Sequence, residues 1–241
     1  MLIGAISDLH GNLIDIYPCE VLFICGDISP LRLQFNMEEM EYWITNEFLP
    51  WCEKLSCERI FLIAGNHDAF LERKKNKALN RISHFEIKRK VHQEITEKYE
   101  KEFDNPDFYL ENELSEYITD NGDCYKIFGT PYCHIFGNWP FMRTDEVLKN
   151  KFFDIPEDCD IVFSHDCPFG TGDVCLELNE KHRGSIPLRD AIIRSKPRYL
   201  FTGHLHSANH NCEILEDTEV YNTSIVNERY EVSYEPLYLN I

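Results

Sequence analysis

Six short apolar runs constrain the fold of this 241-residue chain more than any other feature. They are LIGAIS at 2–7, VLFIC at 21–25, RIFLIA at 59–64, CYKIFG at 124–129, DIVFS at 160–164 and RYLFT at 198–202. Each is followed at once by Gly, Asp, Thr or His, and none keeps a regular apolar-polar alternation. Such runs suit strands that are buried on both faces. The chain therefore predicts a core of buried strands that end at polar loops.

Helical patterns lie between some of these runs. Asn36 can cap a helix on which six apolar residues from Met40 to Leu55 share one side, and Pro50 is expected to kink it or to start a second segment. Residues 186–195 predict another short helix, with proline tolerated in its first turn.

The later part of the chain favours hairpins. Residues 117–128 predict one around Asp120-Asn121-Gly122-Asp123, because Asn-Gly suits the positive φ angles of a tight type I′ turn. The last thirty residues are also β-rich. Strands with interleaved helices, followed by hairpins, favour an α/β (α+β) class in which a two-sheet β-sandwich is flanked by helices, over a simple doubly wound sheet.

The length fits one domain over residues 1–241, because no Pro/Gly/Ser-rich linker marks a boundary. Residues 70–103 are charged and strongly helix-forming, with sparse apolar positions. We expect this segment to be a helical insertion on the outside of the domain.

Charge and cysteine usage narrow the partners and the compartment. The chain carries 42 acidic and 24 basic side chains, a formal charge of −18, which disfavours long nucleic acid as a partner. Its ten cysteines form no CxxC pair, and no basic leader precedes the first apolar run, so we expect a reduced, cytoplasmic protein. No apolar run approaches the roughly 20 residues that span a bilayer, and no membrane association is expected. The oligomeric state stays open.

Polar residues that can bind a metal ion or transfer a proton follow five of the six runs. The set comprises Asp8, His10, Asp27, Asn66, His67, Asp68, His165, His204 and His206. Loops at strand ends commonly carry functional side chains, and residues two apart on an extended backbone point to the same face. Each of the pairs Asp8/His10 and His204/His206 can therefore reach one metal ion or two adjacent ones.

The ligand types indicate the kind of metal. Carboxylate, amide and imidazole without thiolate favour a divalent transition metal such as Mn, Fe, Co, Ni or Zn over a Cys-ligated structural zinc or an all-oxygen calcium site. The candidate ligands outnumber those that one tetrahedral ion needs. Two ions that share a carboxylate are the simplest interpretation.

These motifs resemble those of the calcineurin-like metallophosphoesterases. The family pattern of D-x-H, G-D, G-N-H-D/E, a later H after a strand, and G-H-x-H is met in order over nearly the whole chain. The segments SHDCPFGTGD, PRYLFTGHLHSANH and YNTSIVNERYEV look most like the small metallophosphoesterase-domain-containing phosphodiesterases. The resemblance implies a four-layer αββα fold.

The resemblance also implies a role for each residue of the set. Asp8, His10 and His206 would bind one metal, Asn66, His165 and His204 the other, and Asp27 would bridge the two. His67 resembles the family's catalytic histidine, which faces the scissile phosphate and donates a proton or hydrogen bond to the leaving oxygen. Asp68 would orient the His67 imidazole.

The expected reaction is hydrolysis of a small phosphodiester, possibly a nucleotide, by a metal-bridging hydroxide, with Mn favoured for activity. A phosphomonoesterase with the same site and a non-catalytic metal-binding interaction module are the alternatives. The arginines of the family's serine/threonine phosphatases are absent from GDIS and AGNHD. Aromatic residues in the loop from His134 to Trp139 are able to stack on a base, but packing explains them equally well.

Overall fold

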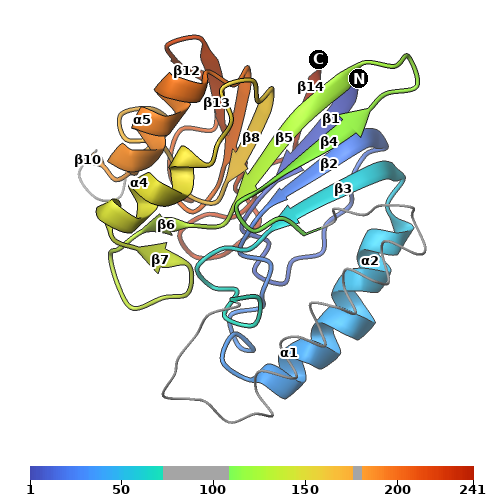
Figure 1. Cartoon of the computed structure of the whole chain (residues 1–241). Coiled ribbons are helices and arrows are strands. Elements are labelled where there is room, and N and C mark those ends of the chain that lie inside the picture. The colour runs from blue at the N-terminus through green and yellow to red at the C-terminus, as the bar shows by residue number, and fades with distance from the viewer. Residues whose placement is uncertain (73–108, 176–180) are drawn as a thin grey trace.

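Two β-sheets stand at the centre of the structure (Figure 1). The structure is a computed structural model that describes residues 1–72, 109–175 and 181–241. The first sheet has the order β14-β1-β2-β3, and the second has the order β12-β13-β11-β8-β5-β4. The predicted class of two sheets flanked by helices is confirmed, while the expected helical insertion lies outside the described residues from position 73 onward.

The six apolar runs all form strands. The four-stranded sheet comprises β1 (Leu2–Ile6), β2 (Cys19–Cys25), β3 (Cys57–Ile63) and β14 (Leu237–Asn240). The six-stranded sheet comprises β4 (Glu113–Ile118), β5 (Cys124–Thr130), β8 (Ile161–Ser164), β11 (Tyr199–Thr202), β12 (Glu213–Leu215) and β13 (Thr218–Asn222). Two short pairs join β6 (Cys133–His134) to β7 (Met142–Arg143) and β9 (Val174–Cys175) to β10 (Lys181–His182).

The strands with buried faces are parallel. β1, β2 and β3 run parallel in one sheet, and β5, β8, β11 and β13 run parallel in the other. The antiparallel strands β14, β12 and β4 occupy sheet edges. Because neighbouring parallel strands end at the same edge, the loops that follow them are brought together.

Phenylalanine rings from both sheets pack in the space between them. Phe23 of β2 lies 5.3 Å, between ring centroids, from both Phe163 of β8 and Phe201 of β11, and 5.7 Å from Phe61 of β3. All four rings are buried. This apolar layer holds the two sheets face to face.

Helices cover the outer faces, with α1 and α2 beside the four-stranded sheet and α4 and α5 beside the six-stranded one (Figure 1). α5 (Ile186–Ser195) matches the predicted helix and is capped by Ser185, whose hydroxyl accepts from Leu188 N. α4 (Asp145–Phe153) was not predicted, because its buried positions, Leu148 and Phe152, give only one i, i+4 pair.

The predicted helix after Asn36 forms as α1 (Met37–Trp43), a π-helical turn η1 (Ile44–Phe48) and α2 (Leu49–Lys54). Asn36 caps it as expected by accepting from Glu39 N, and Pro50 stands in the first turn of α2. The π turn was not foreseen, since an apolar period does not distinguish i→i+4 from i→i+5 bonding.

The predicted hairpin forms between β4 and β5, but its turn is not type I′. Thr119 N donates to Asp123 O and Gly122 N donates to Thr119 O, so the loop is longer than two residues. Gly122 has a positive φ and Asn121 does not, whereas type I′ needs both. Within the described part of the chain, no helix is long and apolar enough to cross a bilayer.

Candidate metal centre

The polar set predicted from sequence gathers where β1, β2, β3, β8 and β11 end. Asp8, Asp27 and His204 each lie two residues beyond a strand, and His165 lies directly after β8. These residues follow strands of both sheets, so the strand ends of the two sheets face one another across the centre.

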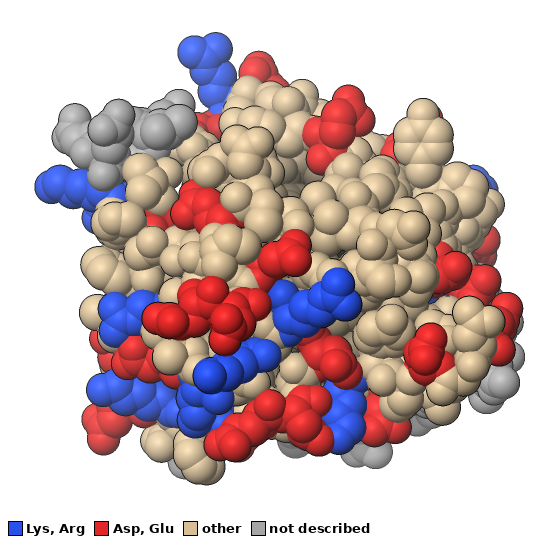
Figure 2. Space-filling view, turned by 90° about the horizontal axis from the view of Figure 1, so that it is seen from above, with Lys and Arg blue, Asp and Glu red and all other residues tan. Residues whose placement is uncertain are grey.

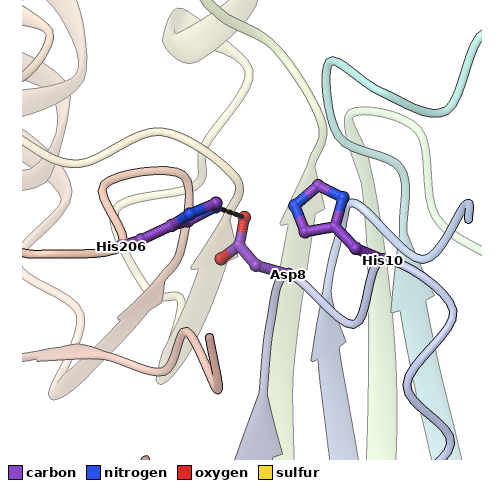
Figure 3. Close-up of side chains that lie close together, drawn as sticks. All are labelled: Asp8, His10 and His206. Carbon is purple, nitrogen blue, oxygen red and sulfur yellow. Dashed lines mark ion pairs between the residues drawn. The ribbon is translucent and has the colours of Figure 1, made fainter. Parts of the chain in front are cut away.

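Asp8, His10 and His206 form the first group (Figure 3). One potential ligand atom from each lies within 4.8 Å of the others, and all three residues are buried. His206 Nε2 lies 3.4 Å from Asp8 Oδ1. Neither ring nitrogen of His10 has a hydrogen-bond partner in the part of the chain that the structure describes. A buried imidazole with both nitrogens unbonded fits a group that binds a cation.

Asp8, Asp27 and His165 form the second group, with the same 4.8 Å limit. His165 Nδ1 donates to the Cys25 carbonyl at 2.9 Å, which fixes the tautomer and leaves Nε2 as the basic nitrogen. Nε2 faces Asn66 Oδ1 at 3.0 Å and Asp27 Oδ2 at 3.4 Å. These groups converge on one point beside the first group.

His204 completes this side of the centre. Its ring centroid lies 5.1 Å from that of His165, and its backbone N–H donates to Asp8 Oδ2 at 3.0 Å. Asp8 therefore contacts residues of both groups, and the two groups form one continuous cluster.

The backbone bends sharply at these positions. Asp8, His10, Asp27 and His204 all have positive φ, between 43° and 70°. Non-glycine residues adopt this left-handed region rarely, and such strain is concentrated at functional sites. The bend turns each side chain out of its strand direction and toward the centre.

Two glycines permit the loops to approach this closely. A Cβ on Gly65 would lie 2.2 Å from Asp27 Oδ1, and a Cβ on Gly203 would lie 2.6 Å from Asp8 Oδ2. The Asp27 carboxylate at Gly65, and the Ser7 hydroxyl together with the Asp8 carboxylate at Gly203, occupy the space that a side chain would fill, so packing requires the glycine of each motif.

Charge in the centre is unevenly distributed. Burial opposes the carboxylate form of Asp8, but the hydrogen bond and charge of His206 outweigh it and hold the pKa of Asp8 below its usual value. Burial lowers the pKa of His10 to about 4, and burial together with His165 lowers the pKa of His204 to about 4. Both imidazoles are therefore neutral near pH 7, the form that binds metal.

His165 behaves in the opposite way. Burial disfavours its charged form, but Asp27 and Asp8 raise its pKa to about 10. The cluster thus draws positive charge to its two carboxylates, as a cation site does.

His67 and Asp68 lie beside the cluster with different partners. The backbone N–H of His67 donates to Asp27 Oδ1 at 2.7 Å, and its ring Nε2 lies 4.0 Å from Asp27 Oδ2. The Asp68 carboxylate accepts from Gly65 N, Ile28 N, and both the N–H and hydroxyl of Ser29. The bonds of Asp68 tie two loops together, and among the described residues the His67 ring donates its hydrogen bond to Gln34 Oε1 instead.

Four neighbours of the cluster were missed or left open by sequence. Tyr230 packs edge-on against His10, with centroids 4.8 Å apart, and Trp139 lies 4.8 Å from His67. Phe136 lies 5.1 Å from His204, and Gln34 contacts His67. Gln34 and Tyr230 carry no local signal, because no metal or catalytic motif includes them.

Asp166 holds the nearby loop of His134. Its carboxylate accepts from the backbone N and the ring Nδ1 of His134.

A family model described as calcineurin-like phosphoesterase matches residues 1–208. The chain belongs to this family. The candidate metal-ligand motifs and the convergence of their side chains agree with that membership.

The chain spans only part of the length of the curated relatives that it matches. Metallophosphoesterase domain-containing protein 1 of Homo sapiens is 24% identical over 98% of this chain and 69% of its own length. A protein of Emericella nidulans named probable rhamnogalacturonate lyase C is 28% identical over 83% of this chain, which spans only 16% of that protein. Phosphopantetheinyl hydrolase from Mycobacterium tuberculosis has the same fold, with a TM-score of 0.55, 13% identity, and 95% and 90% of the two chains covered.

Proposed function

We propose that this chain is a hydrolase that uses two divalent metal ions to cleave a small phosphodiester. Membership of the calcineurin-like phosphoesterase family supports the reaction class. The observation that carries the proposal is the buried convergence of Asp8, His10 and His206 from separate segments, with both His10 nitrogens unbonded among the described residues.

The proposed ligand sets follow the two sides of the cluster. Asp8, His10 and His206 would hold one ion, Asn66, His165 and His204 would hold the other, and Asp27, which lies beside His165 in the second group, would serve both. When bound, the ions supply positive charge that neutralises a phosphate and makes a water more acidic. The donor set of imidazole, carboxylate and amide oxygen suits Mn, Fe, Co, Ni or Zn, and we expect Mn to support activity.

The chain itself supplies a group for the departing alcohol. His67 lies at the edge of the cluster with its Nε2 toward Asp27 and 13% of its side chain exposed. From there the imidazole can donate a proton or a hydrogen bond to the leaving oxygen. Asp68 supports this step indirectly, because its bonds fix the loops that carry Asp27 and His67.

An aromatic rim favours a substrate with a flat apolar group. Phe35 and Phe136 are exposed, and Trp139 lies between Phe35 and the ring of His67. Exposed rings beside a phosphate site can stack on an aryl group or a base. A small diester that carries a nucleobase meets both requirements.

Surface charge and free cysteines bear on the proposed partners and compartment. On the face seen from above in Figure 2, basic side chains interleave with acidic ones, which with the charge of −18 argues against long nucleic acid. Nine described cysteines are free, which is typical of a reducing compartment such as the cytoplasm.

The test combines metal analysis with hydrolysis of bis-p-nitrophenyl phosphate and p-nitrophenyl phosphate, with Mn²⁺ and with chelator. We expect close to two ions per chain, Mn²⁺-dependent turnover and faster cleavage of the diester. Faster cleavage of the monoester would overturn the diester assignment. Metal binding without hydrolysis of either ester, or no metal binding, would favour the non-catalytic interaction module.

A further inference from the structure

We propose that Gln34 is a positioning residue that fixes the orientation and tautomer of the His67 imidazole. The inference deepens the proposed function, since it concerns the group that faces the leaving oxygen. It rests on a contact between segments 33 residues apart in the chain, in which the ring Nδ1 of His67 lies 2.6 Å from Gln34 Oε1.

The partner atom determines which nitrogen carries the proton. An amide oxygen accepts and cannot donate, so Nδ1 must carry the hydrogen of this bond. In the neutral ring, Nε2 is then the basic nitrogen, and it is the one that faces Asp27 Oδ2 at 4.0 Å. Gln34 therefore holds toward the cluster the nitrogen that takes up the ring's second proton and that, in the protonated ring, donates this proton to the leaving oxygen.

The segment that carries Gln34 is itself well anchored. Leu33 is buried and donates its N–H to Pro30 O, and Asn36 N donates to Leu33 O before its side chain caps α1. This succession of turns places Gln34 against the ring at a defined point. The Gln34 side chain therefore starts from a backbone position that is held in place.

The same segment also closes the face of the ring. Phe35 stacks on Trp139 with centroids 6.1 Å apart and planes at 21°, and Trp139 lies 4.8 Å from His67. Packing on the ring face restricts tilting, but it does not distinguish a flipped ring from an unflipped one. Among the described contacts of His67, the hydrogen bond from Nδ1 to Gln34 is the one that makes that distinction.

Asp68, the neighbouring acid, is committed elsewhere. Its carboxylate accepts from Ser29 and Gly65, and it is fully buried below the loop. A neutral amide orients the imidazole without adding a third negative charge beside Asp8 and Asp27. Geometry therefore assigns to Gln34 the orienting role that the motif alone suggests for Asp68.

The first test is kinetic and uses Gln34→Leu, which removes the acceptor, and Gln34→Glu, which keeps an oxygen at the same position. For diesters with poor leaving groups, Gln34→Leu should lower kcat about tenfold, a part of the 10²–10⁴-fold that a general acid contributes, with KM and metal content unchanged. Gln34→Glu keeps the acceptor but adds a negative charge, so it should retain more of the rate than Gln34→Leu. In a His67→Ala background, Gln34→Leu should cause no further loss, and an equal loss there would overturn the proposal.

The second test does not depend on activity. Long-range ¹H–¹⁵N NMR of the ring nitrogens, with diamagnetic Zn²⁺ in place of Mn²⁺ and His67 assigned by its loss in His67→Ala, should show the Nδ1–H tautomer. Gln34→Leu should convert it to a mixture. A neutral ring that carries its hydrogen on Nε2 in the natural protein, or an unchanged spectrum in Gln34→Leu, would refute the role. If no ester is hydrolysed, the proposed function fails, and the tautomer still decides the role of Gln34.

Discussion

Single residues at the strand ends combine unusual backbone angles with metal-ligand chemistry. Asp8 and Asp27 adopt left-handed φ angles and are buried together with histidines from other segments. Two carboxylates this close repel one another unless positive charge lies between them. In the described structure that charge comes from protonated histidines, and a bound metal ion would replace their protons.

Asp27→Asn tests the arrangement at this scale. Asparagine keeps the size but loses the negative charge that we propose is shared by both ions, so metal affinity should fall by more than about 100-fold, beyond the usual effect of an outer ligand partner. Hydrolysis should fall with it. Metal analysis after dialysis measures the effect. The control is Asp190→Asn, which changes an exposed aspartate on α5. Two tightly retained ions in Asp27→Asn would contradict a shared role.

At the scale of elements, the site depends on how closely neighbouring loops approach. The loop after β1 runs beside the loop after β2, with Asp8 N donating to Gly26 O and His10 N to Asp27 O. The loop after β3 joins them through Gly65 and Asp68. The three parallel strands of one sheet thus present a single set of interlocked loops.

Gly65→Ala should separate metal binding from folding. The new methyl would overlap Asp27 Oδ1, Asp27 N and His165 Cε1, so the Asp27 loop and the His165 ring must move, and we expect metal affinity to fall about 10–100-fold while the β-sheets stay intact. Circular dichroism and metal titration give the two readouts. Gly122→Asn is the matched control, since its site is open and asparagine tolerates a positive φ. Unchanged metal affinity in Gly65→Ala would show that the close contact is not needed.

At the scale of the whole molecule, the layer of rings between the sheets sets the position of one half of the site relative to the other. Asp8, Asp27 and Asn66 follow strands of one sheet, whereas His165 and His204 follow strands of the other. Any change in the spacing of the sheets therefore changes every distance across the cluster.

Phe163→Ala should destabilise the protein by about 3–5 kcal/mol, because it leaves a cavity between the sheets. Phe163 is fully buried and contacts the rings of Phe23 and Phe61. Chemical denaturation measures the change, with Phe153→Ala on the exposed side of α4 as the control. A loss below about 1 kcal/mol would mean that the sheets are held together elsewhere.

The sequence predicted the parts of this protein that local patterns encode. Apolar runs marked six strands, Asn36 marked a helix start, and the residues after the strands marked the candidate ligands, because burial, capping and ligand chemistry all act over a few neighbouring positions. In the π turn of Ile44–Phe48 and in the loop at Gly122, backbone hydrogen bonds join residues one position farther apart than we expected. Residue type does not specify this difference.

Only the tertiary structure decided which side chains meet. It paired His67 with Gln34 and gave Asp68 to the loop of Ser29, although Asp68 is the sequence neighbour of His67. It also placed Tyr230 and Trp139 around the histidines. Such contacts join segments that are far apart in the chain, and their geometry depends on the packing of two sheets, so no local pattern contains them.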